Sequence, residues 1–160
     1  MKMIKLKIYL QILLIKNLLY RQFRNISTRV IYAQAVHETG NFTSGVFLKG
    51  NNLFGMQPNS RKWDDDSPER IGKEGSATYS SRYQSIRDYF DRQLQFKVDL
   101  SNDGEYMLST LRTGYATDPN YLTAWQAQYL KVPRIQNNIL YALAIIVTAF
   151  IVWRLKKGKS

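Results

Sequence analysis

The chain has 160 residues, of which 23 are Lys or Arg, 12 are Asp or Glu, one is His and none is Cys. This length suits one domain of ordinary size. Without cysteine, the chain has no disulfide scaffold, no thiol nucleophile and no zinc site with thiolate ligands, and its single His excludes a His-rich metal site. The sequence also contains no P-loop, no GxGxxG motif and no EF-hand loop, so we expect no metal site and no cofactor.

The net charge of +11 is concentrated at the two ends of the chain. Residues 1–30 contain seven Lys or Arg and no acid, and residues 154–160 contain four more, so the stretch 31–153 is neutral. A nucleic-acid-binding domain would carry its excess positive charge on the folded body. Basic ends beside apolar runs suit an anionic membrane surface better, so we expect a lipid membrane as a partner, and no nucleic acid.

The first 24 residues are apolar and basic. Ile8, Ile12, Ile15 and Leu19 recur at helical spacing, which predicts a basic amphipathic helix over residues 1–24. Its apolar stretch is too short to span a bilayer, and no small-residue cleavage site follows it. Three interpretations stay open: the helix packs on the domain, lies on a membrane, or acts as an uncleaved anchor.

Residues 25–136 form the predicted soluble domain. Helical patterns cover residues 25–38, 85–100, 104–113 and 119–131. The segment after Gly40, which includes the sequence NNLFG, is interpreted as a loop, and residues 59–78, rich in Asp, Ser, Gly and Lys, as a loop or a poor hairpin. Strands are few in this interpretation, so we expect a mainly α domain.

The stretch Ile139–Trp153 has 15 residues without a charge and is followed by a basic tail. At about 1.5 Å per residue it covers roughly 23 Å of a hydrocarbon core about 30 Å thick. Tyr141, Trp153 and Arg154 can sit at the interfaces and extend this reach. A buried core helix is the alternative, but the run has no polar face. The sequence therefore predicts a transmembrane helix at 139–155 and a basic tail at 156–160.

Glu38 is the strongest candidate for a chemical role. It lies in the last turn of the helix predicted over 25–38, where the chain opens toward a cleft. A carboxyl group partly withdrawn from water has a raised pKa and stays protonated near neutral pH. Such a group can protonate the leaving oxygen of a glycosidic bond. His37 is more typical of a packing residue, and Asp64–Asp66 of a solvated acidic turn than of a cation site.

Four motifs lie in the order typical of one family. They are AQA and ETG within residues 33–40, NNLFG at 51–55, a YSS…S…DY pattern over 79–89 and GYATDPNY at 114–121. In these motifs the chain resembles the glucosaminidase domain of bacterial and phage peptidoglycan hydrolases, the family of flagellar rod-cap muramidases and autolysins. The resemblance implies a lysozyme-like α-rich (α+β) domain with a small loop or hairpin lobe.

The resemblance also implies the site. Glu38 resembles the family's general acid, and Tyr115 the tyrosine that lines the cleft near the reacting sugar. The implied substrate-binding residues are Asn52, Phe54, Gly55, Tyr79 and Tyr121. No metal is implied.

A second carboxylate is expected in the hairpin lobe of this family. Glu74 is the candidate, with Glu69 as the alternative. A carboxylate placed to activate water would support hydrolysis. If none reaches the site, attack by the sugar itself would give an anhydro product, as in lytic transglycosylases.

The sequence thus predicts a membrane-anchored peptidoglycan hydrolase that cleaves the β-1,4 glycan backbone as a glucosaminidase, a muramidase or a lytic transglycosylase. The basic tail favours a cytoplasmic C-terminus with the domain facing the wall, in a bacterial inner membrane or an internal virion membrane. In the virion hypothesis, a phage particle carries the hydrolase, and virion or membrane proteins are partners. One rival is a non-catalytic membrane or virion structural protein with a glycan-binding lysozyme-like domain. A pore-forming lysis protein would leave NNLFG and YATDP unexplained.

Overall fold

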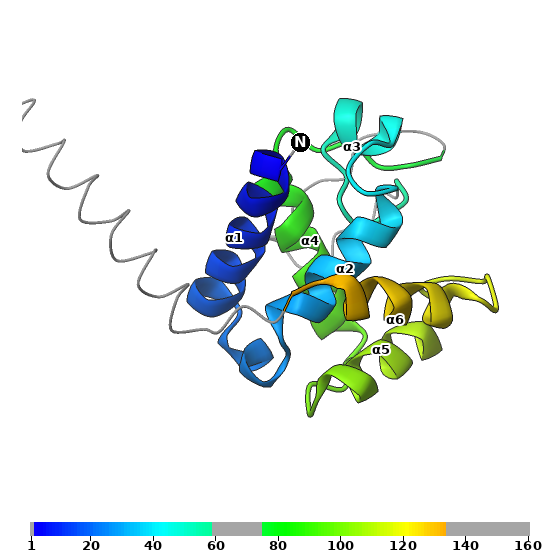
Figure 1. The fold of residues 1–160 in the computed structure, drawn as a ribbon. Coiled ribbons are helices and arrows are strands. Elements are labelled where there is room, and N and C mark those ends of the chain that lie inside the picture. The colour runs from blue at the N-terminus through cyan, green and yellow to red at the C-terminus, as the bar shows by residue number, and fades with distance from the viewer. Residues whose placement is uncertain (1, 59–74, 134–160) are drawn as a thin grey trace, which may run out of the picture.

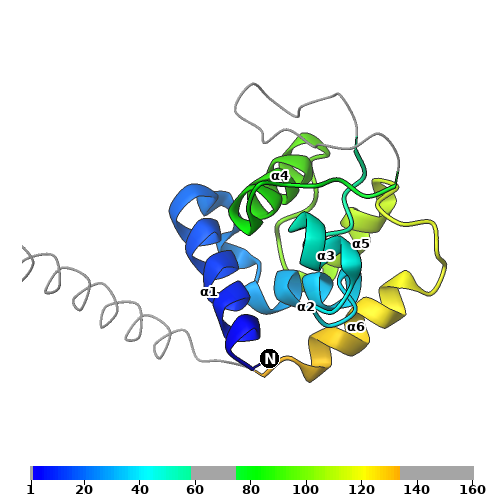
Figure 2. The same ribbon diagram turned by 90° about the horizontal axis from the view of Figure 1, so that it is seen from above.

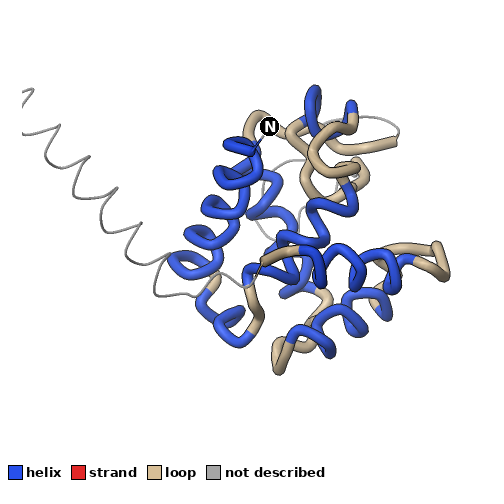
Figure 3. The backbone as a smooth tube through the Cα atoms, in the orientation of Figure 1, coloured by secondary structure: helices blue, strands red, loops and turns tan. Residues whose placement is uncertain are grey.

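The structure is a computed structural model that describes residues 2–58 and 75–133 (Figure 1). The elements are α1 (Lys2–Leu19), a 3₁₀ helix η1 (Arg21–Asn25), α2 (Thr28–Glu38), α3 (Gly45–Gly50), α4 (Arg82–Gln95), α5 (Asp103–Arg112) and α6 (Tyr121–Lys131). The described residues are helix and loop and contain no strand (Figure 3), which confirms the prediction of a mainly α domain for this part of the chain.

The structure does not describe two of the features predicted from the sequence. The hairpin lobe, with Glu69 and Glu74, and the transmembrane helix predicted at 139–155 lie outside the described residues. None of the helices within 2–58 and 75–133 combines the length and the apolar character needed to cross a membrane.

Helix α2 is the centre of the domain. It packs against α6 on one side and α1 on the other, and Figures 1 and 2 show it between these two helices. Eight of its eleven residues are buried, including the polar Thr28 and Gln34. Ser27 caps it by accepting a hydrogen bond from the Val30 amide. A helix buried on nearly all sides gives a rigid support to the residue at its end, which is Glu38.

The N-terminal segment is part of the same core. Helix α1 packs on α2 and α4 and buries Ile8, Ile12 and Ile15. Lys16 is also buried, and its ammonium donates a hydrogen bond of 2.7 Å to the Ile26 carbonyl. Of the three interpretations of this segment, the structure therefore shows the one in which the helix packs on the domain.

Hydrogen bonds from side chains to backbone carbonyls, in both directions, hold helix α6 against α2. The Trp125 indole donates to the Val30 carbonyl at 2.9 Å. Arg29 donates to the carbonyls of Tyr129 and Val132, which satisfies backbone acceptors at the end of α6. These contacts fix α6, and with it the preceding segment 113–120, relative to α2.

Three predicted helices are shorter in the structure: α1 ends at Leu19, α2 begins at Thr28 and α6 begins at Tyr121, against predictions of 1–24, 25–38 and 119–131. The larger differences concern α4 and the segment after Gly40. Helix α4 was predicted over residues 85–100 but spans Arg82–Gln95. It begins earlier because Ser81 caps it, and it ends earlier because the chain leaves the helix before Lys97, which has a left-handed φ of +51°. The segment after Gly40 was expected to be a loop, but it contains α3. Its Ser44 cap accepts from the Phe47 amide, and Asn51 ends it in the left-handed conformation.

Candidate active site

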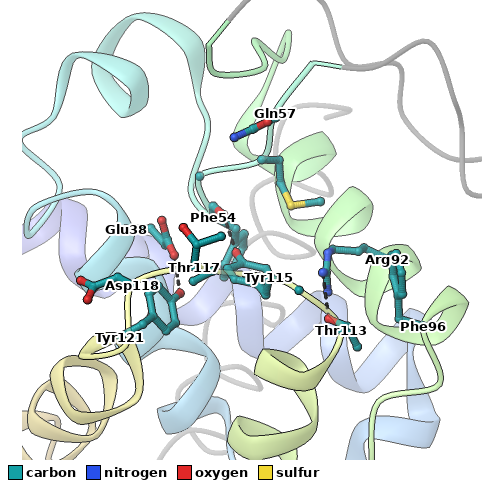
Figure 4. A pocket seen from close by; sticks show the side chains of 14 residues that line it. Glu38, Phe54, Gln57, Arg92, Phe96, Thr113, Tyr115, Thr117, Asp118 and Tyr121 are labelled. Atoms are coloured by element: carbon teal, nitrogen blue, oxygen red, sulfur yellow. Dashed lines mark hydrogen bonds between the residues drawn. The ribbon is translucent and has the colours of Figure 1, made fainter.

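A pocket of about 520 Å³ lies where four segments meet: the end of α2, residues 54–57, the end of α4 and the segment 113–121 (Figure 4). Its wall includes Glu38, Gly55, Tyr115 and Tyr121, all of which the sequence predicted as site residues. The four come from three separate stretches of the chain, so the fold brings them together.

Glu38 is a partly buried carboxyl at this wall. Burial raises the pKa of Glu38 from 4.5 to about 7, and the hydrogen bond from Tyr121 opposes the rise. A large fraction of the group is therefore protonated near neutral pH. In that form it can donate a proton to a ligand in the pocket.

A buried hydrogen-bond chain orients the partner of Glu38. The fully buried Gln34 donates from Nε2 to the Tyr121 hydroxyl at 3.1 Å, and its Oε1 accepts from the Tyr89 hydroxyl. Since Tyr121 accepts from Gln34, its own hydroxyl proton is directed to Glu38 Oε1 (Figure 4). With Oε1 occupied as an acceptor, Oε2 is the oxygen that can carry the acidic proton.

Gly55 lies directly against that second oxygen. A Cβ at this position would overlap Glu38 Oε2 and lie 3.1 Å from the carboxyl carbon. The residue also has a φ of +62°, which only glycine adopts readily. Glycine is therefore required here both by the turn and by the close approach of the carboxyl group.

Asn52 and Phe54 hold the turn that contains Gly55 and are themselves buried. The Asn52 amide donates to the carbonyls of Met56 and Ala77, and its Oδ1 accepts from the amides of Phe54 and Met56. The Asn52 side chain is therefore engaged inside the protein, and Asn52 is not among the residues that line the pocket.

Phe54 borders the pocket, but its ring has no exposed area. The ring stacks on Tyr89 with centroids 3.9 Å apart. The Tyr115 hydroxyl donates to the Phe54 carbonyl, which ties the segment 113–121 to the turn at Gly55. Both Tyr115 and Phe54 thus fix the shape of the pocket.

Tyr79 and His37 lie outside the pocket lining. Tyr79 is buried and donates to Asp88, so the structure places this predicted substrate contact in the protein interior. The His37 ring packs edge-on against Tyr121, with centroids 4.9 Å apart, and burial lowers the pKa of His37. A packing role is what the sequence favoured for His37.

The second carboxylate predicted from the sequence, Glu74 or Glu69, falls outside the described residues. Among the described lining residues, the other acid is Asp118, which is exposed and accepts a hydrogen bond from the Asn120 amide. The pKa of Glu38 owes its rise to burial and not to a neighbouring charge. The described residues contain no cluster of His, Cys, Asp or Glu suited to a metal ion.

Three further residues contribute to the site that the sequence analysis did not select. Gln34 and Asp118 lie inside the AQA and GYATDPNY motifs, so the signal was present there. Arg92 lies in no motif. Its guanidinium packs 4.6 Å from the ring centroids of both Phe96 and Tyr115 and donates to Thr113 (Figure 4).

The raised pKa of Glu38 predicts a pH-dependent stability. The folded-state pKa of about 7 exceeds the ordinary value of 4.5, so the contribution of Glu38 to stability is fully present below pH 4.5 and is lost as pH rises through 7. At 1.36 kcal/mol per pKa unit, the loss is about 3 kcal/mol. Urea unfolding of wild type and Glu38→Gln at pH 4.5 and pH 8 measures it. A loss of the same size in the variant would contradict the assignment to Glu38.

The chain is similar to several known proteins. The peptidoglycan hydrolase FlgJ of Pseudomonas aeruginosa (strain PAO1) is 33% identical over 117 residues, which cover 60% of this chain and 29% of that protein. The chain therefore spans less than a third of the length of this relative.

Similar solved structures include a peptidoglycan hydrolase from Sphingomonas sp. A1, with 23% identity and a TM-score of 0.49 over 71% of this chain and 86% of that one. The glycoside hydrolase domain of Salmonella typhimurium FlgJ has 20% identity and a TM-score of 0.47 over 83% and 86%. Residues 19–132 match the family described as "Glucosaminidase: Mannosyl-glycoprotein endo-beta-N-acetylglucosaminidase". Because this match covers well over half of the sequence, the chain belongs to the glucosaminidase family.

Proposed function

We propose that the chain is a glycosidase that cleaves the β-1,4 glycan backbone of peptidoglycan, with Glu38 as its general acid. The observation that carries the proposal is the carboxyl of Glu38, which lies at the pocket wall with its pKa raised to about 7 by burial. A carboxyl kept partly protonated beside a ligand pocket is what protonation of a glycosidic oxygen requires.

In this proposal the two carboxyl oxygens of Glu38 have separate roles. Oε1 accepts the hydrogen bond from Tyr121, and Oε2, next to Gly55, carries the proton. Transfer of this proton to the glycosidic oxygen breaks the bond to the anomeric carbon and leaves Glu38 as a carboxylate. The Tyr121 hydroxyl then stabilises the new negative charge. The carboxylate takes a proton back from the water or sugar hydroxyl that attacks the anomeric carbon.

The pocket wall suits a carbohydrate. Its lining includes the aromatic rings of Phe96 and Tyr115 and the polar side chains of Gln57 and Thr117 (Figure 4). A sugar ring presents an apolar face and a rim of hydroxyls, and both kinds of group are needed to bind it. The relatives described as peptidoglycan hydrolases support peptidoglycan as the polymer.

The rival function is glycan binding without catalysis. Burial of an ionisable carboxyl destabilises a fold, and a pure binding surface gains nothing from a raised pKa. In addition, the buried Gln34 donates to Tyr121 and so orients the Tyr121 hydroxyl toward the Glu38 carboxyl. These features favour catalysis.

Digestion of purified peptidoglycan with the purified full chain tests the proposal. We expect soluble fragments cut within the glycan strand, identified by mass spectrometry of their new ends. Reducing ends indicate hydrolysis and also distinguish glucosaminidase from muramidase cleavage, whereas anhydro ends indicate transglycosylase chemistry. Glycan strands that stay intact while the protein co-sediments with the polymer would contradict the proposal and support the binding rival.

Membrane anchoring by residues 139–155 is part of the proposal. Its support is the uncharged run Ile139–Trp153 and the cations that follow it. The hypothesis of a phage virion as the setting stays a prediction, which detection of the protein in purified particles would test.

A further inference from the structure

Helix α1 is apolar on the side that faces away from the domain as well as on the side that packs. Met3, Leu6, Leu14 and Leu18 are exposed at the spacing of one helix face, and the exposed Lys7 lies among them. Met3 is 71% exposed, Leu14 45% and Leu18 66%. A surface helix normally turns charged and polar residues to water, so four exposed apolar residues on one helix face indicate a partner.

The charged residues of α1 and η1 themselves are all of one sign. The chain has no acidic residue before Glu38, while residues 1–30 contain seven Lys or Arg. Lys7 is exposed on α1, and Arg21 and Arg24 are exposed on η1 immediately after it. An apolar helix face with cations beside it is typical of helices that lie in the interface of an anionic membrane.

We infer that the outer face of α1 docks on an anionic lipid bilayer, with Met3, Leu14 and Leu18 in the boundary between headgroups and acyl chains. Lys7, Arg21 and Arg24 then lie near the lipid phosphates. The helix rests on the membrane and does not cross it, because its opposite face, with Ile8 and Ile12, is buried against α2 and α4. This surface is separate from the pocket, whose lining contains no residue of α1.

Charge argues against two other occupants of the face. A second copy of α1 would bring a second set of cations and no acid against the first, which is unfavourable. The chain's own run Ile139–Trp153 is followed by four more cations and also offers no acid. A bilayer with anionic headgroups supplies the opposite charge as well as the apolar phase.

Docking in this orientation leaves the pocket free. Figures 1 and 2 show α1 at one edge of the domain and the segment 113–120, which borders the pocket, at the opposite edge. The outer face of α1 and the pocket thus point in different directions. A protein held by α1 would present the pocket away from the bilayer.

The absence of native cysteine gives a direct test in the full chain. A single cysteine at Leu14 carries a fluorophore whose emission responds to polarity. Leu48→Cys, on α3, is the matched control because Leu48 is also an exposed leucine, 66% exposed. On addition of phosphatidylglycerol vesicles we expect the label at position 14 to report an apolar environment and the label at 48 to stay in water. Insertion of the C-terminal segment alone would not move the label at 14.

Charge and salt complete the test. In the protein labelled at Leu14→Cys, the additional substitution Lys7→Gln should weaken binding to phosphatidylglycerol vesicles by about fivefold. Higher ionic strength should weaken this binding further. An equal response with neutral phosphatidylcholine vesicles would overturn the inference. A label at position 14 that is shielded from water without lipid would also overturn the inference. Shielding at all protein concentrations would indicate that another part of the chain covers the face, and shielding only at high concentrations would indicate a second copy.

Discussion

Glu38→Gln is expected to lower turnover on peptidoglycan by at least about 100-fold, because a general acid contributes about 100- to 10,000-fold. Glutamine keeps the size of the side chain and an oxygen that accepts from Tyr121, but it has no acidic proton to transfer. Substrate binding, and hence KM, should change little. Wild-type activity should also fall as pH rises through about 7, where Glu38 loses its proton.

The matched control is Glu105→Gln, which makes the same chemical change on α5, outside the pocket lining. Its turnover should equal that of wild type. Unfolding of Glu38→Gln at pH 8 separates loss of chemistry from loss of structure, since removal of a buried charge should make this variant more stable than wild type. A Glu38→Gln protein that digests peptidoglycan at the wild-type rate would remove Glu38 from the proposed mechanism.

Much of the helical framework could be predicted from the sequence, and the failures have local causes. The predicted helix over 25–38 was close to α2 because the Ser27 cap and the apolar spacing agree. Helix α3 was missed because it is short and has a glycine at each end, so it resembles a loop. The start of α4 was missed because the cap at Ser81 precedes the first apolar residue of the pattern.

The site was only partly predictable for a different reason. Motifs identify residues that act together, but they do not separate those that face a ligand from those that hold the backbone. Asn52 is in the NNLFG motif as a buried support of the turn, and Gly55 in the same motif lies at the pocket wall. Arg92 could not be found from the sequence, because its place depends on the packing of Phe96 against Tyr115 across its guanidinium.

Gly55→Ala is expected to destabilise the fold by about 2–3 kcal/mol and to lower turnover by about 100-fold. A positive φ costs an alanine about 1 kcal/mol, and overpacking adds about 1 kcal/mol or more. The overlap between the new methyl group and Glu38 Oε2 must be relieved by movement of the carboxyl or of the turn. A shift of about 1 Å at a reacting group is enough for a loss of about 100-fold.

Gly75→Ala separates the cost of the backbone from that of the overlap. Gly75 also has a positive φ, +76°, but among the described residues a Cβ there would meet no atom within 4 Å, and Gly75 is not among the described residues that line the pocket. This variant should lose about 1 kcal/mol of stability and keep its turnover. If Gly55 acts through the carboxyl of Glu38, then Gly55→Ala combined with Glu38→Gln should be no less active than Glu38→Gln alone, because the group that the methyl displaces no longer performs the chemistry. A double variant whose two losses multiply would show that Gly55 serves the reaction by another route, such as direct contact with the sugar.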